Sequence, residues 1–242
     1  LARHSGPGRP WAADAGRGRR GRIGRGCVVA GGNVMTTRVY LIRHGTTSFV
    51  VDDLFSGATD VMLSAEGQRQ AALLGQRLAN EKLAALYSSP LRRALQTAAL
   101  VAPHLTAIPC DGLREIDYGH WETHPRREVA AQFAAEYAAW QADPYSRAPL
   151  GGETGAAVLA RVLPALRRIV ADHPGQTVAV VSHKSAIRLL LCGLLGLDPR
   201  DYRDRLEQYP AGLNIIDFQD AKRPRLVLYN DISHYVAADP QA

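Results

Sequence analysis

The stretch Thr-Val-Ala-Val-Val at 177–181 decides the fold class of this 242-residue chain. It is apolar on both faces, which is typical of a strand at the centre of a parallel sheet covered by helices on both sides. A second run, Arg-Val-Tyr-Leu-Ile-Arg at 38–43, is compact and rich in β-branched and aromatic residues. It predicts another buried strand.

Strands and helices are expected to alternate along the rest of the chain. Further strand-like runs lie at 84–87, 113–116, 214–218 and 226–229. Helical patterns run from Ser64, from Ser89-Pro90 to about 102, from about 126 to 141, from Thr154 to about 172 and from Ser185 to 195. Proline at 90 suits the first helical position. This alternation predicts an α/β fold, a three-layer α/β/α sandwich with a mostly parallel central sheet.

Composition narrows the class of protein. Hydrophobic residues make up 46% of the chain and charged residues 21%, which excludes a chain that is disordered throughout. No run of about 18 apolar residues occurs, so an integral membrane protein is also excluded. The three cysteines have neither metal-ligand nor redox spacing, and we expect a cytoplasmic protein that holds no metal.

The net charge of +6 comes from one end of the chain. Residues 1–34 hold seven arginines against Asp14, whereas residues 35–242 carry no net charge. The Gly/Arg-rich composition of 1–34 predicts a disordered basic extension, and 35–242 is expected to form a single domain. The charge therefore gives no reason to expect nucleic-acid binding by the folded domain.

Several origins of residues 1–34 stay open. They are a translated stretch upstream of Met35, a cloning remnant or a targeting extension, and the first two are preferred. The apolar segment at 27–30 is too short for a secretory signal. A Gly/Arg-rich arm that binds RNA is a further alternative.

Basic side chains and two histidines follow the predicted strands. His44 comes after the first strand and His183 after the strand at 177–181, with Arg43 and Lys184 beside them. Two further arginines, at 92–93, lie at the start of a predicted helix. Ligands of open parallel sheets bind at the carboxyl ends of strands, so these groups are expected to form a cationic cup. Such a cup suits a phosphate ester.

Five motifs occur in the order found in the histidine phosphatase superfamily. They are Arg-His-Gly-Thr-Thr at 43–47, Ser-Ser-Pro-Leu-Arg-Arg-Ala-Leu-Gln-Thr-Ala at 88–98, Leu-Arg-Glu-Ile at 113–116 with Tyr118-Gly119, Gly-Gly-Glu at 151–153 and Ser-His at 182–183. Phe-Ser-Gly at 55–57 adds a matching stretch. The chain thus resembles the phosphoglycerate-mutase-like branch over about residues 38–235. Arg-His-Gly alone would be weak evidence, but five ordered motifs are strong.

The resemblance implies a metal-independent phosphomonoester hydrolase without a cofactor. His44 would attack phosphorus and form a phosphohistidine, and Glu115 would give and then take the proton. Arg43, Arg93 and His183 would hold the oxygens of the transferred phosphoryl group. The expected partner is a small phosphorylated metabolite of the sugar phosphate or phosphoglycerate type.

The resemblance also implies a set of substrate-binding residues. They are Thr47, Ser56, Gly57, Tyr118 and Lys184. The family often has glycine where Lys184 stands, and its ammonium is expected either to bind a second anionic group of the substrate or to face solvent. For Glu153, a capping role and a substrate contact stay equally open.

Two other functions are kept as alternatives. A cofactor-dependent phosphoglycerate mutase would carry an additional basic segment with paired arginines, which is not recognisable here. Arg126-Arg127 is interpreted as a solvated helix start, so hydrolysis is preferred. A non-catalytic phospho-ligand or RNA-binding protein is the remote alternative, and Glu115 argues against it because binding needs no proton donor. The oligomeric state stays open, with a homodimer as one option.

Overall fold

A computed structural model describes residues 35–219 and 223–236, so the predictions for 1–34 lie outside the described residues. The strands are β1 (Thr37–Arg43), β2 (Leu83–Ser88), β3 (Ile108–Pro109), β4 (Thr177–Ser182), β5 (Leu213–Phe218) and β6 (Pro224–Asp231). The α-helices are α1 (Ser48–Val51), α2 (Ala65–Leu78), α3 (Arg92–Val101), α4 (Arg126–Gln132), α5 (Ala134–Ala142), α6 (Gly155–Asp172), α7 (Lys184–Leu195), α8 (Tyr202–Arg205) and α9 (Ser233–Val236). Short 3-10 turns lie at Asp111–Leu113, Gly119–Trp121 and Pro199–Asp201.

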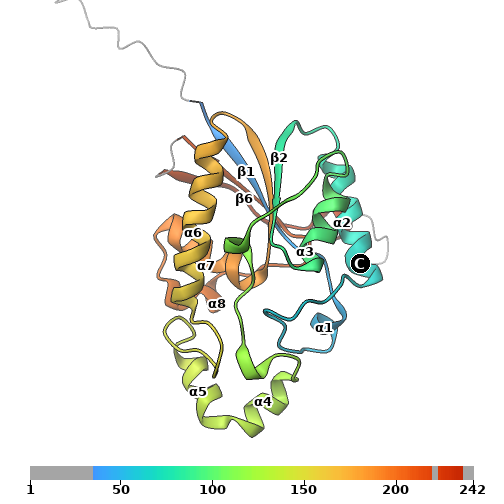
Figure 1. The fold of residues 1–242 in the computed structure, drawn as a ribbon. Coiled ribbons are helices and arrows are strands. Elements are labelled where there is room, and N and C mark those ends of the chain that lie inside the picture. Colours follow the sequence, from blue (N-terminus) through green and yellow to red (C-terminus); the bar gives the residue numbers. More distant parts are fainter. Residues whose placement is uncertain (1–34, 220–222, 237–242) are drawn as a thin grey trace, which may run out of the picture. The chain divides into compact units, whose positions relative to one another are not determined.

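The described strands form one mostly parallel sheet with the order β3-β2-β4-β1-β5-β6 (Figure 1). The pairs from β3 to β1 are parallel, whereas β5 is antiparallel to β1 and to β6. The predicted central strand, β4, lies between β2 and β1. The predicted α/β sandwich is confirmed.

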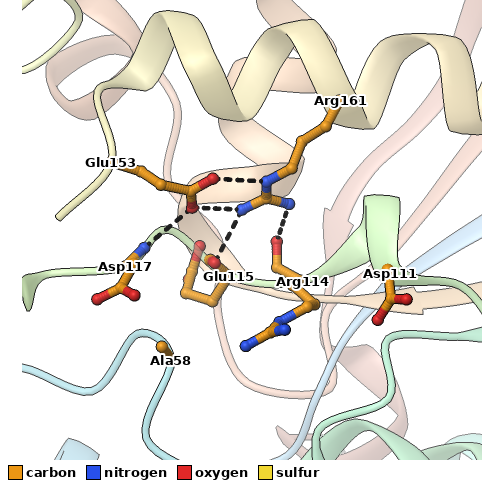
Figure 2. Close-up of a pocket in the computed structure, with 7 residues that line it drawn as sticks. All are labelled: Ala58, Asp111, Arg114, Glu115, Asp117, Glu153 and Arg161. Carbon is orange, nitrogen blue, oxygen red and sulfur yellow. Dashed lines mark hydrogen bonds and ion pairs between the residues drawn. The ribbon is translucent and has the colours of Figure 1, made fainter.

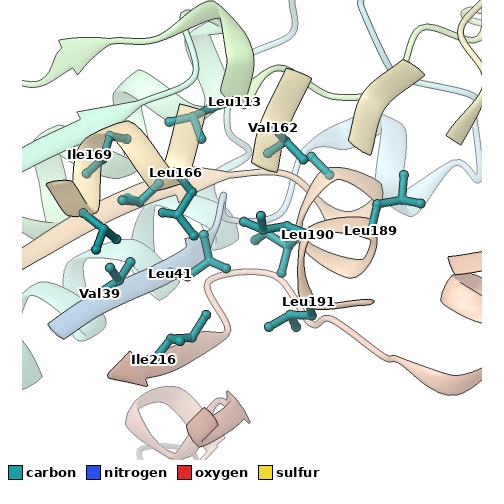
Figure 3. Packing of buried hydrophobic residues seen from close by; sticks show 14 of the residues in the cluster. Val39, Leu41, Leu113, Val162, Leu166, Ile169, Leu189, Leu190, Leu191 and Ile216 are labelled. Atoms are coloured by element: carbon teal, nitrogen blue, oxygen red, sulfur yellow. The ribbon is translucent and has the colours of Figure 1, made fainter. Parts of the chain in front are cut away.

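Helices cover both faces of the sheet because the central strands are apolar on both faces. Val39 and Leu41 of β1 pack with α6 and α7, whereas Tyr40 and Ile42 face α2 and α3. Figure 3 shows the first of these clusters, where Leu41 lies among Leu166, Leu190 and their neighbours. Burial of these side chains drives the folding of the sandwich.

Local signals set the ends of several helices as the sequence predicts. The hydroxyl of Ser64 accepts the N–H of Gly67 at 3.1 Å and caps α2. Thr154 caps α6 in the same way, by accepting the N–H of Ala157 at 3.1 Å. Gly196 ends α7 in the left-handed conformation, with φ of 71°.

Three local predictions are wrong. The helix expected at Pro90 begins at Arg92. Ser89 still pairs with β4, because its N–H donates to the carbonyl of Val181. The expected strand at 113–116 is a 3-10 turn followed by an extended segment, since Arg161 and Ser182 side chains bind its carbonyls. A two-residue strand, β3, takes the edge position instead.

The third error concerns the helix expected over 126–141. It is two helices, α4 and α5, separated at Phe133, whose φ and ψ are −119° and 41°. The break allows Val129 of α4 and Trp140 of α5 to pack in one aromatic cluster with Phe55 and Trp121. In Figure 1, α4 and α5 lie at the end of the sheet where β1 ends, together with α1.

The helices after β1 and β4 leave on opposite faces of the sheet. Helix α2, which follows β1 and the short α1, packs on the face with Tyr40 and Ile42, and α7 packs on the other face. Because β1 and β4 are adjacent and parallel, a crevice is expected between their carboxyl ends, as at the switch points of other doubly wound sheets. No described helix has both the length and the apolar character that crossing a membrane would require.

We expect Arg38→Ala to lower the free energy of unfolding at neutral pH by about 1–3 kcal/mol, because it removes a two-pronged ion pair between β1 and β5. Arg38 Nε and Nη2 lie 2.7 and 2.9 Å from the carboxylate of the buried Asp217, and their hydrogen bonds hold its pKa below 3.8. The difference in free energy of unfolding between the two proteins should have its full size above pH 3.8. It should shrink to zero as the pH falls through the lowered pKa of Asp217. Urea unfolding of both proteins across this range tests it, and a constant difference would contradict it.

Candidate active site

Two adjacent strands end at the same level, and the residues after them form the centre of the site. In the parallel pair β1–β4, Arg43 lies opposite Ser182, so the next residues, His44 and His183, leave the sheet side by side. The N–H of His44 donates to the carbonyl of Ser182 at 3.0 Å. The two imidazole rings are 5.0 Å apart between centroids. The structure therefore brings the two predicted histidines together.

The ring of His44 is held in one tautomer. Its Nδ1 lies 2.7 Å from the carbonyl oxygen of Gly45, and a carbonyl only accepts, so Nδ1 carries the proton. Among the described residues, no side chain or backbone group pairs with Nε2. A neutral ring in this tautomer presents a lone pair at Nε2, as a nucleophile needs.

Electrostatics keeps this ring neutral. Burial, with the positive charges of Arg93 and Arg43, lowers the pKa of His44 well below 6.5. An imidazolium here would lose its hydration and face two cations. The lone pair at Nε2 is therefore available at neutral pH.

Arg43 contributes a buried positive charge at the end of β1. Its Nη1 donates to the carbonyl of Gln208 at 2.6 Å, whereas its buried Nε has no partner in the described structure. Burial lowers the pKa of Arg43 to about 10, which still leaves the group charged at neutral pH. A buried donor without a partner is costly, and an anion bound beside it would satisfy it.

Arg93 forms a hydrogen bond with His183, whose ring lies next to that of His44. The Nε of Arg93 donates to Nδ1 of His183 at 3.3 Å, so the proton of the neutral ring lies on Nε2, which donates to Ser89 Oγ at 2.7 Å. Burial, with the charge of Arg93, lowers the pKa of His183 well below 6.5. Both ring nitrogens thus have protein partners, and binding of a phosphoryl oxygen by His183 requires one of these bonds to break.

Glu115 is buried with its carboxylate at the start of α7. The N–H groups of Ser185 and Ala186 donate to it at 3.1 Å each, and the N–H of Ile116 donates at 2.9 Å. A helix N-terminus supplies free N–H groups and a positive field, which suit a carboxylate. Helix α7 thus sets the position of the Glu115 side chain.

A cavity of about 160 Å³ opens above these groups. Seven of the ten predicted site residues line it: Arg43, His44, Thr47, Ser56, Glu115, Tyr118 and Lys184. The hydroxyl of Thr47 is buried there and, like Arg43 Nε, has no hydrogen-bond partner among the residues that the structure describes. Both are free to bind an oxyanion. Burial raises the pKa of Tyr118 to about 12, so its phenol stays protonated.

The other three predicted residues do not line this cavity. They are Arg93, His183 and Gly57. The backbone of Gly57 is fully engaged: its N–H donates to Glu122 at 2.9 Å and its carbonyl accepts from Arg93 at 2.6 Å. A Cβ at this position would lie 1.8 Å from the carbonyl oxygen of Ile116. The structure thus gives Gly57 a place in holding Arg93.

Lys184 lines the cavity and is bound by a carboxylate. Its Nζ lies 2.9 Å from Glu207, which also binds Arg188 at 3.0 Å. Burial lowers the pKa of Lys184 below 10.5, and the ion pair with Glu207 opposes this effect. The Lys184 side chain is 38% exposed as well as part of the cavity lining, so both alternatives for it, a substrate contact and a solvent-facing position, stay predictions.

Sequence reasoning missed Arg126. The residue was interpreted as part of a solvated helix start, but its guanidinium lies 4.5 Å from the centre of the Phe55 ring and lines the cavity beside Asp53. The ion pair with Asp53 is 3.4 Å long. No local pattern identifies this role, because Phe55 is distant in sequence and only the fold brings it under the guanidinium.

Glu122 was also missed. Its carboxylate accepts the backbone N–H groups of Gly57, Ala58 and Thr59 at 2.9–3.2 Å. The carbonyls of Gly57 and Thr59 in turn accept Arg93. One carboxylate thus orders the loop that holds the buried arginine.

Comparisons with known proteins identify relatives of this chain. The family described as the histidine phosphatase superfamily (branch 1) matches residues 39–232. Phosphoserine phosphatase 1 of Hydrogenobacter thermophilus is 36% identical over 163 residues, covering 66% of this chain and 77% of the relative. The adenosylcobalamin/alpha-ribazole phosphatase of Escherichia coli is 33% identical over 162 residues, covering 66% and 80%. The structure of Bacillus stearothermophilus YhfR matches with a TM-score of 0.77 and 30% identity, covering 82% of this chain and 98% of that one.

We expect His44 to stay neutral at pH values well below 6.5, because its ring is buried beside two cations. An NMR titration of the histidine nitrogens should show Nδ1 protonated and Nε2 bare at neutral pH. Replacing Arg93 with Met should move the titration toward 6.5, because one of the two cations is gone. A midpoint near 6.5 in the unaltered protein would contradict this account.

Proposed function

The chain belongs to branch 1 of the histidine phosphatase superfamily, and on this premise we propose that it hydrolyses small phosphate monoesters through a phosphohistidine on His44. One observation carries the proposal. The Nε2 of a neutral His44 has no partner among the described residues, and His44 lines the same cavity as Glu115 and the charged Arg43.

In the first step, the lone pair of His44 Nε2 attacks phosphorus. The bond between phosphorus and the ester oxygen breaks, and its electron pair leaves with that oxygen. Glu115 in its acid form gives the oxygen a proton, so the alcohol departs neutral. Nδ1 keeps its proton and its bond to the carbonyl of Gly45, which holds the ring in place as positive charge develops on it.

In the second step, water attacks the phosphohistidine. The Glu115 carboxylate takes a proton from the water, the P–N bond breaks and its electron pair returns to Nε2. Inorganic phosphate leaves, and His44 and Glu115 return to their starting states. The backbone N–H groups that bind Glu115 stabilise its carboxylate form, which is the form that acts as the base in this step.

The positive charge for both steps comes from side chains. Arg43 offers its unpaired Nε, and Thr47 offers a hydroxyl without a partner, to the oxygens of the phosphoryl group. Arg93 adds a second buried guanidinium behind them. We therefore propose a reaction that needs neither metal ion nor cofactor.

The substrate we propose carries a second anionic group. Lys184 and Arg126 line the outer part of the cavity, and the cavity is small at about 160 Å³. The two relatives are named for phosphoserine and for adenosylcobalamin and α-ribazole, so relatives of similar identity act on different esters. Of these, phosphoserine has a carboxylate that fits beside the two cations.

Several expectations from the sequence accompany this proposal. Action in the cytoplasm and a folded domain that binds no nucleic acid remain predictions, as does a homodimer as one option. The division into an extension at 1–34 and a domain at 35–242 also remains a prediction. Deleting residues 1–34 and measuring both RNA affinity and phosphatase rate separates the two parts.

We expect His44→Ala to abolish phosphate release from p-nitrophenyl phosphate, and chelator to leave the parent's rate unchanged. Rapid quenching of the parent enzyme should yield a phosphorylated peptide that contains residue 44, identified by mass spectrometry. Release that survives in His44→Ala, or that chelator stops, would overturn the proposed mechanism.

A mutase would behave differently with 3-phosphoglycerate. It would isomerise this compound when a bisphosphorylated primer is added and would release little phosphate. We expect the opposite balance, in which water is the preferred acceptor.

We expect Arg126→Met and Lys184→Met each to raise KM for phosphoserine about tenfold, because a charge-assisted bond to its carboxylate is lost. KM for phosphoethanolamine, which lacks the carboxylate, should change little. Arg127→Met is the matched control, since Arg127 is adjacent to Arg126 but does not line this cavity. Equal changes for both substrates would contradict the assignment.

A further inference from the structure

A second cavity, of about 360 Å³, lies on the other side of Glu115 (Figure 2). An ion pair of Glu153 with Arg161 lies along its wall, with distances of 2.9 and 2.8 Å between the paired atoms. Figure 2 shows this pair between α6 and the segment that carries Glu115. The proposed function uses neither residue, although both contact the Glu115 segment.

Arg161 uses all five of its N–H groups. Two donate to the carboxylate of Glu153. The other three donate to backbone carbonyls of Gly112, Arg114 and Glu115, at 3.2, 2.7 and 2.9 Å. One side chain of α6 therefore binds three carbonyls of the segment that leads into and contains Glu115. A guanidinium has the donors for this arrangement, and an ammonium with three does not.

Glu153 binds the same segment on the other side of Glu115. Its carboxylate accepts the N–H of Asp117 at 3.1 Å, and its own N–H donates to the carbonyl of Asp117 at 2.8 Å. Burial raises the pKa of Glu153, but Arg161 outweighs this effect and holds it below 4.5. Of the two alternatives from the sequence, the helix cap is wrong, and the substrate contact stays an untested prediction. Thr154 is the cap, and Glu153 pairs with Arg161.

Glu115 is thus held at both of its ends by different helices. Its carbonyl is bound by Arg161 of α6, and its carboxylate is bound by the N–H groups of Ser185 and Ala186 in α7. Within the described ranges, the segment from 113 to 117 pairs with no strand in a β-ladder. Besides the burial of Leu113 and Ile116 and the bond from Ser182 to the carbonyl of Leu113, the segment is held by the side-chain hydrogen bonds of Arg161 from α6.

We propose that Arg161, supported by Glu153, is a positioning residue for Glu115. Arg161 orients the carboxyl group of Glu115 for proton transfer and does not itself touch the substrate. The inference rests on the proposed function, in which Glu115 gives a proton to the leaving oxygen. Loss of Arg161 leaves three carbonyls without donors, so the Glu115 segment shifts and proton transfer slows. Attack by His44 should be spared, because in the described part of the chain the hydrogen bonds of Arg161 go to Glu153 and to the 112–115 segment and not to β1.

The test compares leaving groups that differ in their need for a proton. Nitrophenolate departs unprotonated, whereas the alkoxide of phosphoserine needs a proton as it leaves. We expect Arg161→Met to slow the single-turnover release of serine from phosphoserine about 10- to 100-fold and to leave the first release of nitrophenol almost unchanged. Glu115→Gln should show the same selectivity. An equal loss with both substrates would show a merely structural role and overturn the inference.

A double variant and a matched control sharpen the result. In a Glu115→Gln background, Arg161→Met should add little further loss with phosphoserine, because the group that it positions is already gone. Arg38→Ala removes a similar two-pronged ion pair far from Glu115 and should leave the ratio of the two rates unchanged. Independent losses from Arg161→Met and Glu115→Gln would overturn the inference.

The failures of the two proposals are distinguishable. If Glu115→Gln spares phosphoserine, the role of Glu115 in the proposed function is wrong and the inference falls with it. If Glu115→Gln is selective and Arg161→Met is not, only the inference is wrong. Should Arg161→Met fail to fold, Arg161→Lys and Glu153→Gln are the milder variants. Both should show the same selectivity to a smaller degree, and its absence from both would overturn the inference.

Discussion

The parallel pairing of β1 with β4 is the constraint on which the rest of the site depends. Its register places Arg43 opposite Ser182, so His44 and His183 leave the sheet at the same level. Helices α2 and α7 pack on opposite faces of the sheet, so neither of them occupies the space between the two carboxyl ends. A shift of one residue in this pairing would turn one of the histidines to the other face of the sheet.

The buried charges at this edge are balanced by backbone groups more than by opposite charges. Arg43 and Arg93 donate to the carbonyls of Gln208, Gly57 and Thr59. A carbonyl satisfies a guanidinium donor without cancelling its charge, so the field of both arginines remains to keep the histidines neutral and to attract an anion. Ion pairs with carboxylates would have weakened that field.

The functional side chains that sequence reasoning identified are those inside ordered motifs. His44, Glu115 and His183 stand in such motifs, and the fold brings each to the same edge. Arg126 and Arg161 stand in no motif, because their partners are an aromatic face and backbone carbonyls supplied by other parts of the chain. Neither kind of partner leaves a pattern at the position of the arginine, so periodicity and local spacing miss them.

The sequence by itself determined the fold class, because the apolar runs at 38–43 and 177–181 suit only strands buried on both faces. It also determined the residue types available for phosphate chemistry and their order along the chain. Only the tertiary structure decided which atoms have partners: in the part of the chain that the structure describes, Nε2 of His44 and Nε of Arg43 have none, whereas the guanidinium of Arg161 uses every donor. Hydrogen-bond satisfaction depends on distances of a few tenths of an ångström between distant segments, and a linear pattern carries no such information.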